Sequence, residues 1–164
     1  MKEYGLLYYD IAATEQNLYM KVRRIIQRTC LPVNLSVYAF DWSIKSTIEE
    51  QLISTGVFSK ANIHMIKFDA SSSTEIETNA LKQLEELFTS IRGRLNTTIR
   101  KIGKVDDTRM EAYLERMTRR VKNYDKILTI YEFANKARPA LDILRKIIND
   151  EYKILKETNE PTNN

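Results

Sequence analysis

The sequence predicts an α+β protein in which a small sheet domain, roughly residues 1–70, is followed by a helical extension over residues 71–157. In the first 70 residues, short apolar runs alternate with helix-start signals. From residue 71 onward, apolar residues recur at helical spacing almost without a break. The chain has 164 residues but only four Gly and three Pro, which argues against long loops or linkers.

Strands and helices are expected to alternate in the first domain. The aromatic-rich run YGLLYYDI (4–11) predicts a buried strand, and VNLSVYAF (33–40) and NIHMIKF (62–68) predict two more. One helix is expected after Thr14, which can cap it, and another in residues 46–56, where Ser46 and Thr47 begin overlapping capping boxes. Residues 33–42 can instead hold two short strands around a tight bend, so a three-strand and a four-strand order both remain open.

Three helices are expected in the extension. The first has an apolar stripe from Ala80 to Ile102, and Pro139 separates the second from the third. The second carries a heptad-like apolar stripe that steps by four and three: Met110, Leu114, Met117, Val121, Tyr124, Leu128 and Tyr131. We therefore predict that the first two helices form an antiparallel hairpin and that this stripe contributes to a homodimer. Residues 158–164 are polar and are expected to form a disordered tail.

The composition excludes several classes of protein. With Cys30 as the single cysteine and His64 as the single histidine, an internal disulfide framework and a classical zinc site within one chain are excluded. We find no membrane-spanning run and no signal pattern, and the cysteine content is typical of a cytoplasmic protein. The sequence also lacks a P-loop, a Gly-rich dinucleotide fingerprint and a serine-nucleophile elbow, so no small-molecule substrate is suggested. His64 is expected to be a sheet residue, and Cys30 a small apolar filler.

Positive charge is concentrated in residues 92–122. This segment has ten Lys and Arg against four Asp and Glu, so its excess of cations is larger than the +4 of the whole chain. The ten cations are the candidate nucleic-acid-binding residues: Arg92, Arg94, Arg100, Lys101, Lys104, Arg109, Arg116, Arg119, Arg120 and Lys122. Such a cluster can hold the phosphate backbone of DNA or RNA without reading its sequence. The alternative is a solvated helix face on which Glu111 and Glu115 offset Arg119 and Arg120.

Short motifs in the first 70 residues resemble a known superfamily. Tyr9–Asp10–Ile11 at the end of an apolar strand, the basic pair Arg23–Arg24 and the run Ser36–Val37–Tyr38 resemble the small CRISPR-associated ferredoxin-like nucleases of the adaptation machinery. The chain is also similar in outline to the N-terminal region of chromate-resistance regulators, in which a ferredoxin-like unit is followed by long charged helices. The resemblance implies a ferredoxin-like fold for the sheet domain.

The same resemblance implies a candidate catalytic and metal-binding role for Asp10. In the nuclease-like family, the matching aspartates of two subunits face each other across a dimer and share a divalent cation, here Mg²⁺ or Mn²⁺. Oxygen ligands suit such cations, and a metal stabilises the charge that develops on a phosphodiester. Asp41 and Asp69 follow other strands, but no spacing argument brings either to Asp10. Alternatively, Asp10 simply ends its strand.

The function that we predict from the sequence is a nucleic-acid-associated accessory or regulatory protein that binds phosphates through a basic helical face, as a homodimer. One alternative is a metal-dependent nuclease with paired Asp10 carboxylates. Another is a non-catalytic module whose helices dock a protein. Tyr113 and Tyr124 would stack on bases only if the apolar stripe were open.

Overall fold

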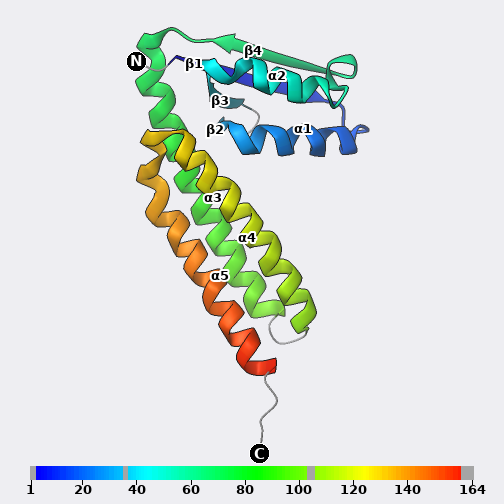
Figure 1. The fold of residues 1–164 in the computed structure, drawn as a ribbon, viewed down its shortest axis with the longest axis vertical. Coiled ribbons are helices and arrows are strands. Elements are labelled where there is room, and N and C mark those ends of the chain that lie inside the picture. Colours follow the sequence, from blue (N-terminus) through cyan, green and yellow to red (C-terminus); the bar gives the residue numbers. More distant parts are fainter. Residues whose placement is uncertain (1–2, 35–36, 103–105, 160–164) are drawn as a thin grey trace, which may run out of the picture.

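A computed structural model gives the fold and describes residues 3–34, 37–102 and 106–159. It is an α+β structure with mostly helical content, as the sequence predicts. A small sheet with two short helices lies across one end of a long bundle of three helices (Figure 1). The first described residues belong to the sheet unit, whereas the last helix ends at the opposite end of the bundle (Figure 1).

The sheet has four antiparallel strands in the spatial order β2-β3-β1-β4. The strands are β1 (Tyr4–Ile11), β2 (Leu31–Asn34), β3 (Val37–Asp41) and β4 (Ala61–Lys67). Of the two orders left open by the sequence, the one with two short strands within residues 31–41 is therefore observed. β1 pairs with β3 on one side and with β4 on the other, where Tyr8 lies opposite His64.

Two helices cover one face of the sheet: α1 (Gln16–Thr29) and α2 (Lys45–Ile53). In α1, Leu18, Val22 and Ile26 are buried at intervals of four residues and pack toward Leu7 of β1. Short 3₁₀ turns precede α2 (Trp42–Ile44) and follow it (Val57–Ser59). Gly56 adopts a φ of 71° between α2 and the second turn, a conformation that glycine reaches without strain.

The predicted helix caps in this domain are wrong. α1 begins at Gln16 with Glu15 as N-cap, and no side chain caps it. Before α2, the Asp41 carboxylate accepts a hydrogen bond from the Ser43 backbone N–H at 2.9 Å and so caps the 3₁₀ turn. Because that turn runs directly into α2, Ser46 and Thr47 lie inside the helix rather than at its start.

The bundle consists of α3 (Ser73–Ile102), α4 (Asp107–Ile130) and α5 (Arg138–Asn159), with 3₁₀ turns at Ala70–Ser72 and Glu132–Ala137. The Asp106 carboxylate accepts a hydrogen bond from the Arg109 backbone N–H at 3.1 Å and caps α4, at the restart that the sequence indicates. α5 continues to Asn159, so residues 158 and 159 of the expected tail are helical, while 160–164 lie outside the described residues.

The heptad-like stripe of α4 is buried inside this bundle. Its seven residues share one hydrophobic cluster with side chains of α3 and α5, including Leu84, Leu95 and Leu144. The expectation that the stripe contributes to a homodimer is therefore wrong, because the third helix of the same chain covers it. The homodimer itself stays a prediction.

A second hydrophobic cluster lies between the sheet and the helices α1 and α2, and the two clusters meet at the sheet. The bundle cluster extends to Tyr4, Leu31 and Ala39 of the strands. The Tyr131 hydroxyl, at the end of α4, donates a hydrogen bond to the Thr29 carbonyl at 2.7 Å and accepts one from the Asp41 N–H at 3.3 Å. The bundle is thus fastened to the sheet unit by apolar packing and by buried hydrogen bonds.

Candidate nucleic-acid interface

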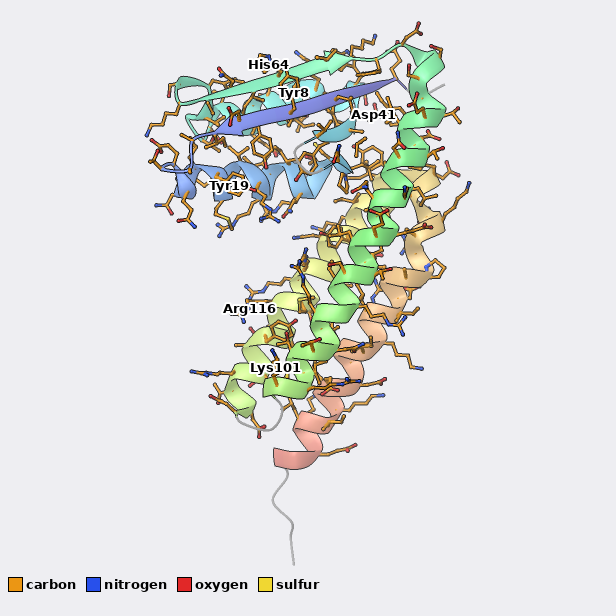
Figure 2. All side chains as sticks on the ribbon, turned by 180° about the vertical axis from the view of Figure 1, so that it is seen from behind. Tyr8, Tyr19, Asp41, His64, Lys101 and Arg116 are labelled. Carbon is orange, nitrogen blue, oxygen red and sulfur yellow. The ribbon has the colours of Figure 1, made fainter. Side chains whose placement is uncertain are left out.

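The structure divides the predicted basic residues among several surfaces. Arg94 of α3 and Arg120 of α4 line one groove between these two helices, with a cavity volume of about 600 Å³. Thr97, Thr98 and Tyr113 also line it, and Arg116 lies over the Tyr113 ring, 6.0 Å from its centre. We call this the α3–α4 groove. Figure 2 shows Arg116 partway along the bundle and Lys101 close to its far tip.

Arg94 and Arg120 line the α3–α4 groove, whereas Arg116 lies beside the lining, over the ring of Tyr113. Within the described part of the chain none of these three arginines forms an ion pair, and no Asp or Glu lines the groove. An unpaired guanidinium keeps all of its donors available for phosphate oxygens, which it can bind through two parallel hydrogen bonds. The groove therefore has the charge and the donors that an anionic backbone requires.

Other predicted cations are already paired or lie elsewhere. An Arg119 nitrogen lies 3.8 Å from a Glu115 oxygen, so this one of the predicted offsetting pairs is present, whereas Glu111 and Arg120 form no ion pair among the described residues. An Arg109 nitrogen lies 3.4 Å from an Asp106 oxygen, a pair that was not predicted. Arg92, Arg100 and Lys101 are exposed on α3, outside the lining of the groove. Lys104 lies outside the described residues.

The two tyrosines of α4 differ in their surroundings. Tyr124 is 6% exposed and packs edge-on against Phe88, with ring centres 5.2 Å apart, so it is a core residue. Tyr113 is half-buried and reaches the α3–α4 groove. Arg120 lies over the Tyr124 ring at 5.9 Å, and such cation–π contacts hold both guanidiniums near the groove. Of the two residues proposed for stacking, Tyr113 alone is accessible enough to contact a base.

A smaller pocket of about 200 Å³ lies closer to the sheet, and Arg120 lines both this pocket and the α3–α4 groove. Arg23 and Gln27 of α1 and Gln83 of α3 also line this pocket. Arg23 was not among the predicted binding residues, because it lies far from residues 92–122 in the sequence. The available signal was the basic, amphipathic character of residues 21–30.

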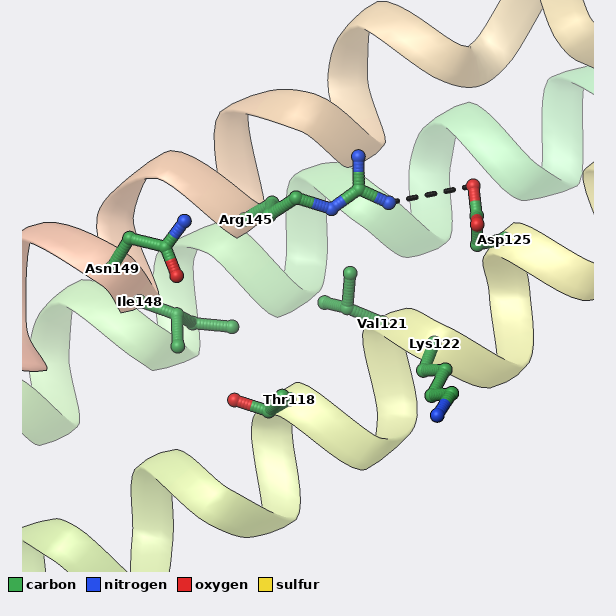
Figure 3. Close-up of a pocket in the computed structure, with 7 residues that line it drawn as sticks. All are labelled: Thr118, Val121, Lys122, Asp125, Arg145, Ile148 and Asn149. Atoms are coloured by element: carbon green, nitrogen blue, oxygen red, sulfur yellow. Dashed lines mark ion pairs between the residues drawn. The ribbon is translucent and has the colours of Figure 1, made fainter.

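The pocket between α4 and α5 differs from the α3–α4 groove in its charges (Figure 3). Its volume is about 250 Å³, and Lys122 and Arg145 line it. The Asp125 carboxylate lies 2.6 Å from an Arg138 nitrogen and 3.4 Å from an Arg145 nitrogen. The hydrogen bond from Arg138, with the charges of both arginines, holds the pKa of Asp125 below its usual range. Arg145 is paired with Asp125 and Asp142, whereas Lys122 forms no ion pair among the described residues. The Asp125 carboxylate in the lining distinguishes this pocket from the α3–α4 groove, which has no acidic lining.

Asp10 is exposed near the end of β1, opposite Asn62 of β4. Asp41 of β3 lies opposite Tyr4 in the strand register, at the other end of β1. At roughly 3.3 Å per residue, this end of β1 is about 20 Å from Asp10. Asp69 follows β4 at that same distant end. Neither joins Asp10, and within the described residues no cluster of three or more His, Cys, Asp or Glu side chains is placed to hold a metal ion. A site built from two Asp10 carboxylates depends on a second chain and stays a prediction.

Cys30 and His64 take no part in the α3–α4 groove. Cys30 is 1% exposed, and burial raises the pKa of its thiol to about 12, which fits the expected filler role. His64 lies in β4, as expected, and its ring stacks on Tyr8 with ring centres 4.7 Å apart. This pair lies on the face of the sheet opposite α1 and α2 and is labelled in Figure 2.

Comparison with known protein families finds no family model that matches this chain, and comparison with curated proteins finds no matching sequence. Among the helices of the described residues, none combines the length and the apolar character that crossing a bilayer requires.

Proposed function

We propose that this protein binds the phosphate backbone of a nucleic acid along the α3–α4 groove, as an accessory or regulatory component. The observation that supports this proposal best is that Arg94 and Arg120 line one groove without acidic lining, that Arg116 lies beside it over the Tyr113 ring, and that none of the three forms an ion pair among the described residues. Backbone binding needs several such cations on one surface and no particular base sequence.

A groove between two packed helices suits a single strand better than a duplex. The axes of packed helices lie about 8–10 Å apart. A DNA duplex is wider than this, since its major groove alone is about 12 Å wide, and so it cannot enter between the helices. Tyr113 lies in the groove beside the arginines, and aromatic side chains in basic grooves stack on unpaired bases. DNA and RNA both fit this description.

We also propose that residues 1–70 form a ferredoxin-like domain. This is supported by the β-α-β-β-α-β order of the elements and by the placement of α1 and α2 on the same face of the antiparallel sheet. A homodimer, if it forms, needs a surface other than the buried stripe of α4.

The proposed function is tested by the salt dependence of binding. Fluorescence anisotropy would follow a labelled single strand and a labelled duplex at about 50 and 200 mM salt. We expect tighter binding of the single strand and a steep loss of affinity at the higher salt concentration. For the single strand, replacing Arg94, Arg116 and Arg120 together by Gln should lower the magnitude of the slope of log K against log[salt] by about two, or about 0.7 for each arginine that no longer neutralises a phosphate.

A matched control has the same change in net charge. Lys82, Arg109 and Arg119 are exposed and ion-paired, with Glu86, Asp106 and Glu115, so replacing these three by Gln should leave the slope nearly unchanged. Equal losses in the two triple variants would show that net charge rather than the groove controls binding. Absence of binding at about 50 mM salt would rule out the proposal and favour a protein-docking role. A gel of the same samples with Mg²⁺ or Mn²⁺ would test the nuclease prediction for Asp10.

A further inference from the structure

The small pocket beside the α3–α4 groove lies where α1, the β2–β3 edge, α3 and α4 meet. We call it the junction pocket. Buried side chains of the two hydrophobic clusters close its inner side: Cys30, Tyr38, Tyr124 and Ile127. Arg120 lines both the junction pocket and the α3–α4 groove, so the two sites adjoin at this side chain. The buried side chains block a strand from passing through the junction pocket into the core.

Two positive charges face the junction pocket, Arg23 from α1 and Arg120 from α4. Both side chains are half-buried, neither forms an ion pair among the described residues, and no carboxylate lines the pocket. Like charges that share a partly desolvated pocket destabilise each other, and a bound anion reverses that effect. The packing thus creates a site that an anion would stabilise.

Neutral polar groups complete the junction pocket. Gln27 and Gln83 line it from α1 and α3, and each amide supplies N–H donors. Tyr38 lies on the inner wall, where burial raises the pKa of its hydroxyl although the positive charge of Arg23 lowers it. A hydrogen bond with Tyr9 also lowers this pKa, but the net shift is upward, so the hydroxyl stays protonated at neutral pH.

The size of the junction pocket limits what can enter it. Its volume of about 200 Å³ is below the roughly 300–1,000 Å³ of sites for drug-sized ligands. A strand cannot pass through a pocket that the core closes on one side, so a strand in the groove can reach it only with an end. A terminal phosphate monoester carries about −1.5 to −2 charges at neutral pH, as phosphoserine does, and can accept from two guanidiniums at once.

We propose that the junction pocket binds the terminal phosphate monoester of a nucleic-acid strand whose adjoining nucleotides lie in the α3–α4 groove. This inference rests on the proposed function and adds to it a preference for phosphorylated strand ends. Arg23 and Arg120 hold the phosphate, and Arg94 and Arg116 hold the backbone that follows.

The test compares internally labelled single strands that differ only at their ends. One has a 5′-phosphate, one a 3′-phosphate, and one has hydroxyls at both ends. We expect one of the phosphorylated strands to bind the full-length protein at least about tenfold more tightly than the hydroxyl strand. Arg23→Gln should abolish that difference while the hydroxyl strand binds within about threefold of its wild-type affinity. Arg94→Gln should weaken all three strands by the same factor, because Arg94 lines the groove and not the junction pocket.

Arg23→Lys is the control for misfolding, because it keeps the positive charge and loses only the planar guanidinium. This variant should retain part of the preference for the phosphorylated strand. Equal affinity of the three strands for the wild-type protein would overturn the inference and leave the proposed function intact. Competition by adenosine monophosphate, without any effect of strand phosphorylation, would assign the pocket to a free nucleotide and would also overturn it. Absence of binding by every strand at about 50 mM salt would instead refute the proposed function itself.

Discussion

At the scale of single residues, two glycines inside regular elements have opposite roles. A Cβ added to Gly5 in β1 would lie 2.5–2.8 Å from ring atoms of Phe40 and Trp42, so the absent side chain makes room for aromatic packing. A Cβ added to Gly93, within α3, would meet nothing within 4 Å. Gly93 is therefore not required for helix packing, although it lowers the stability of its helix.

We expect Gly5→Ala and Gly93→Ala to change stability in opposite directions. The first should lower the free energy of unfolding by about 1–3 kcal/mol, because the buried Phe40 ring must shift. The second should raise it by about 0.5–1 kcal/mol, because alanine loses less conformational entropy in a helix. Urea denaturation of both variants measures the difference, and a loss of stability in Gly93→Ala would contradict the open surroundings of that residue.

At the scale of elements, the Asp125 carboxylate joins α4 to α5 through Arg138 and Arg145. Its pKa in the folded protein is lowered, mainly by the hydrogen bond from Arg138. A lowered carboxyl pKa stabilises the folded state above the pKa of the unfolded chain, and the stabilisation is lost as the pH falls through the folded value. This contribution is therefore present at neutral pH and disappears in acid, below about pH 4.

We expect the free energy of unfolding of the wild-type protein to fall more steeply between pH 5 and pH 2 than that of Asp125→Asn. At neutral pH the variant should be less stable by no more than about 1 kcal/mol, because the Asp125 side chain is 38% exposed and water screens the pair. Denaturation curves across this pH range test the prediction. Asp150→Asn, a control on α5 without an ion pair among the described residues, should keep the wild-type slope.

The elements also show which local signals are reliable. The apolar stripes of α3 and α4 predicted both helices, because burial of one face fixes the spacing of apolar residues. The predicted caps at Thr14, Ser46 and Thr47 were wrong. Residues that can cap a helix are frequent in any sequence, and the path of the chain decides which of them lies where a helix begins. Asp41 lies where β3 ends and therefore caps the turn before α2.

At the scale of the whole molecule, the two hydrophobic clusters are joined at the sheet and are expected to unfold together. Tyr4, Leu31 and Ala39 pack into the bundle cluster, and the Tyr131 hydroxyl bonds to backbone groups of Thr29 and Asp41. Trp42, the one tryptophan of the chain, lies beside the sheet, whereas far-UV circular dichroism reports mainly the helices.

We therefore expect coincident unfolding midpoints by tryptophan fluorescence and by circular dichroism. Tyr131→Phe should lower the free energy of unfolding by about 0.5–1.5 kcal/mol, because it removes hydrogen bonds to partly buried backbone groups. Two separate transitions in the wild-type protein would show that the sheet unit and the bundle fold independently.

The sequence by itself determined the α+β class, the long helices and the concentration of positive charge in residues 92–122, because periodicity and composition are local properties of a chain. Only the tertiary structure decided that Arg94 and Arg120 line one groove with Arg116 beside it, all three unpaired among the described residues, while Arg109 and Arg119 are neutralised. It also brought Arg23 beside Arg120, although 97 positions separate them, and it placed Asp41 and Asp69 far from Asp10. The physical reason is that strand order and helix packing decide which distant residues meet, and no local pattern encodes those choices.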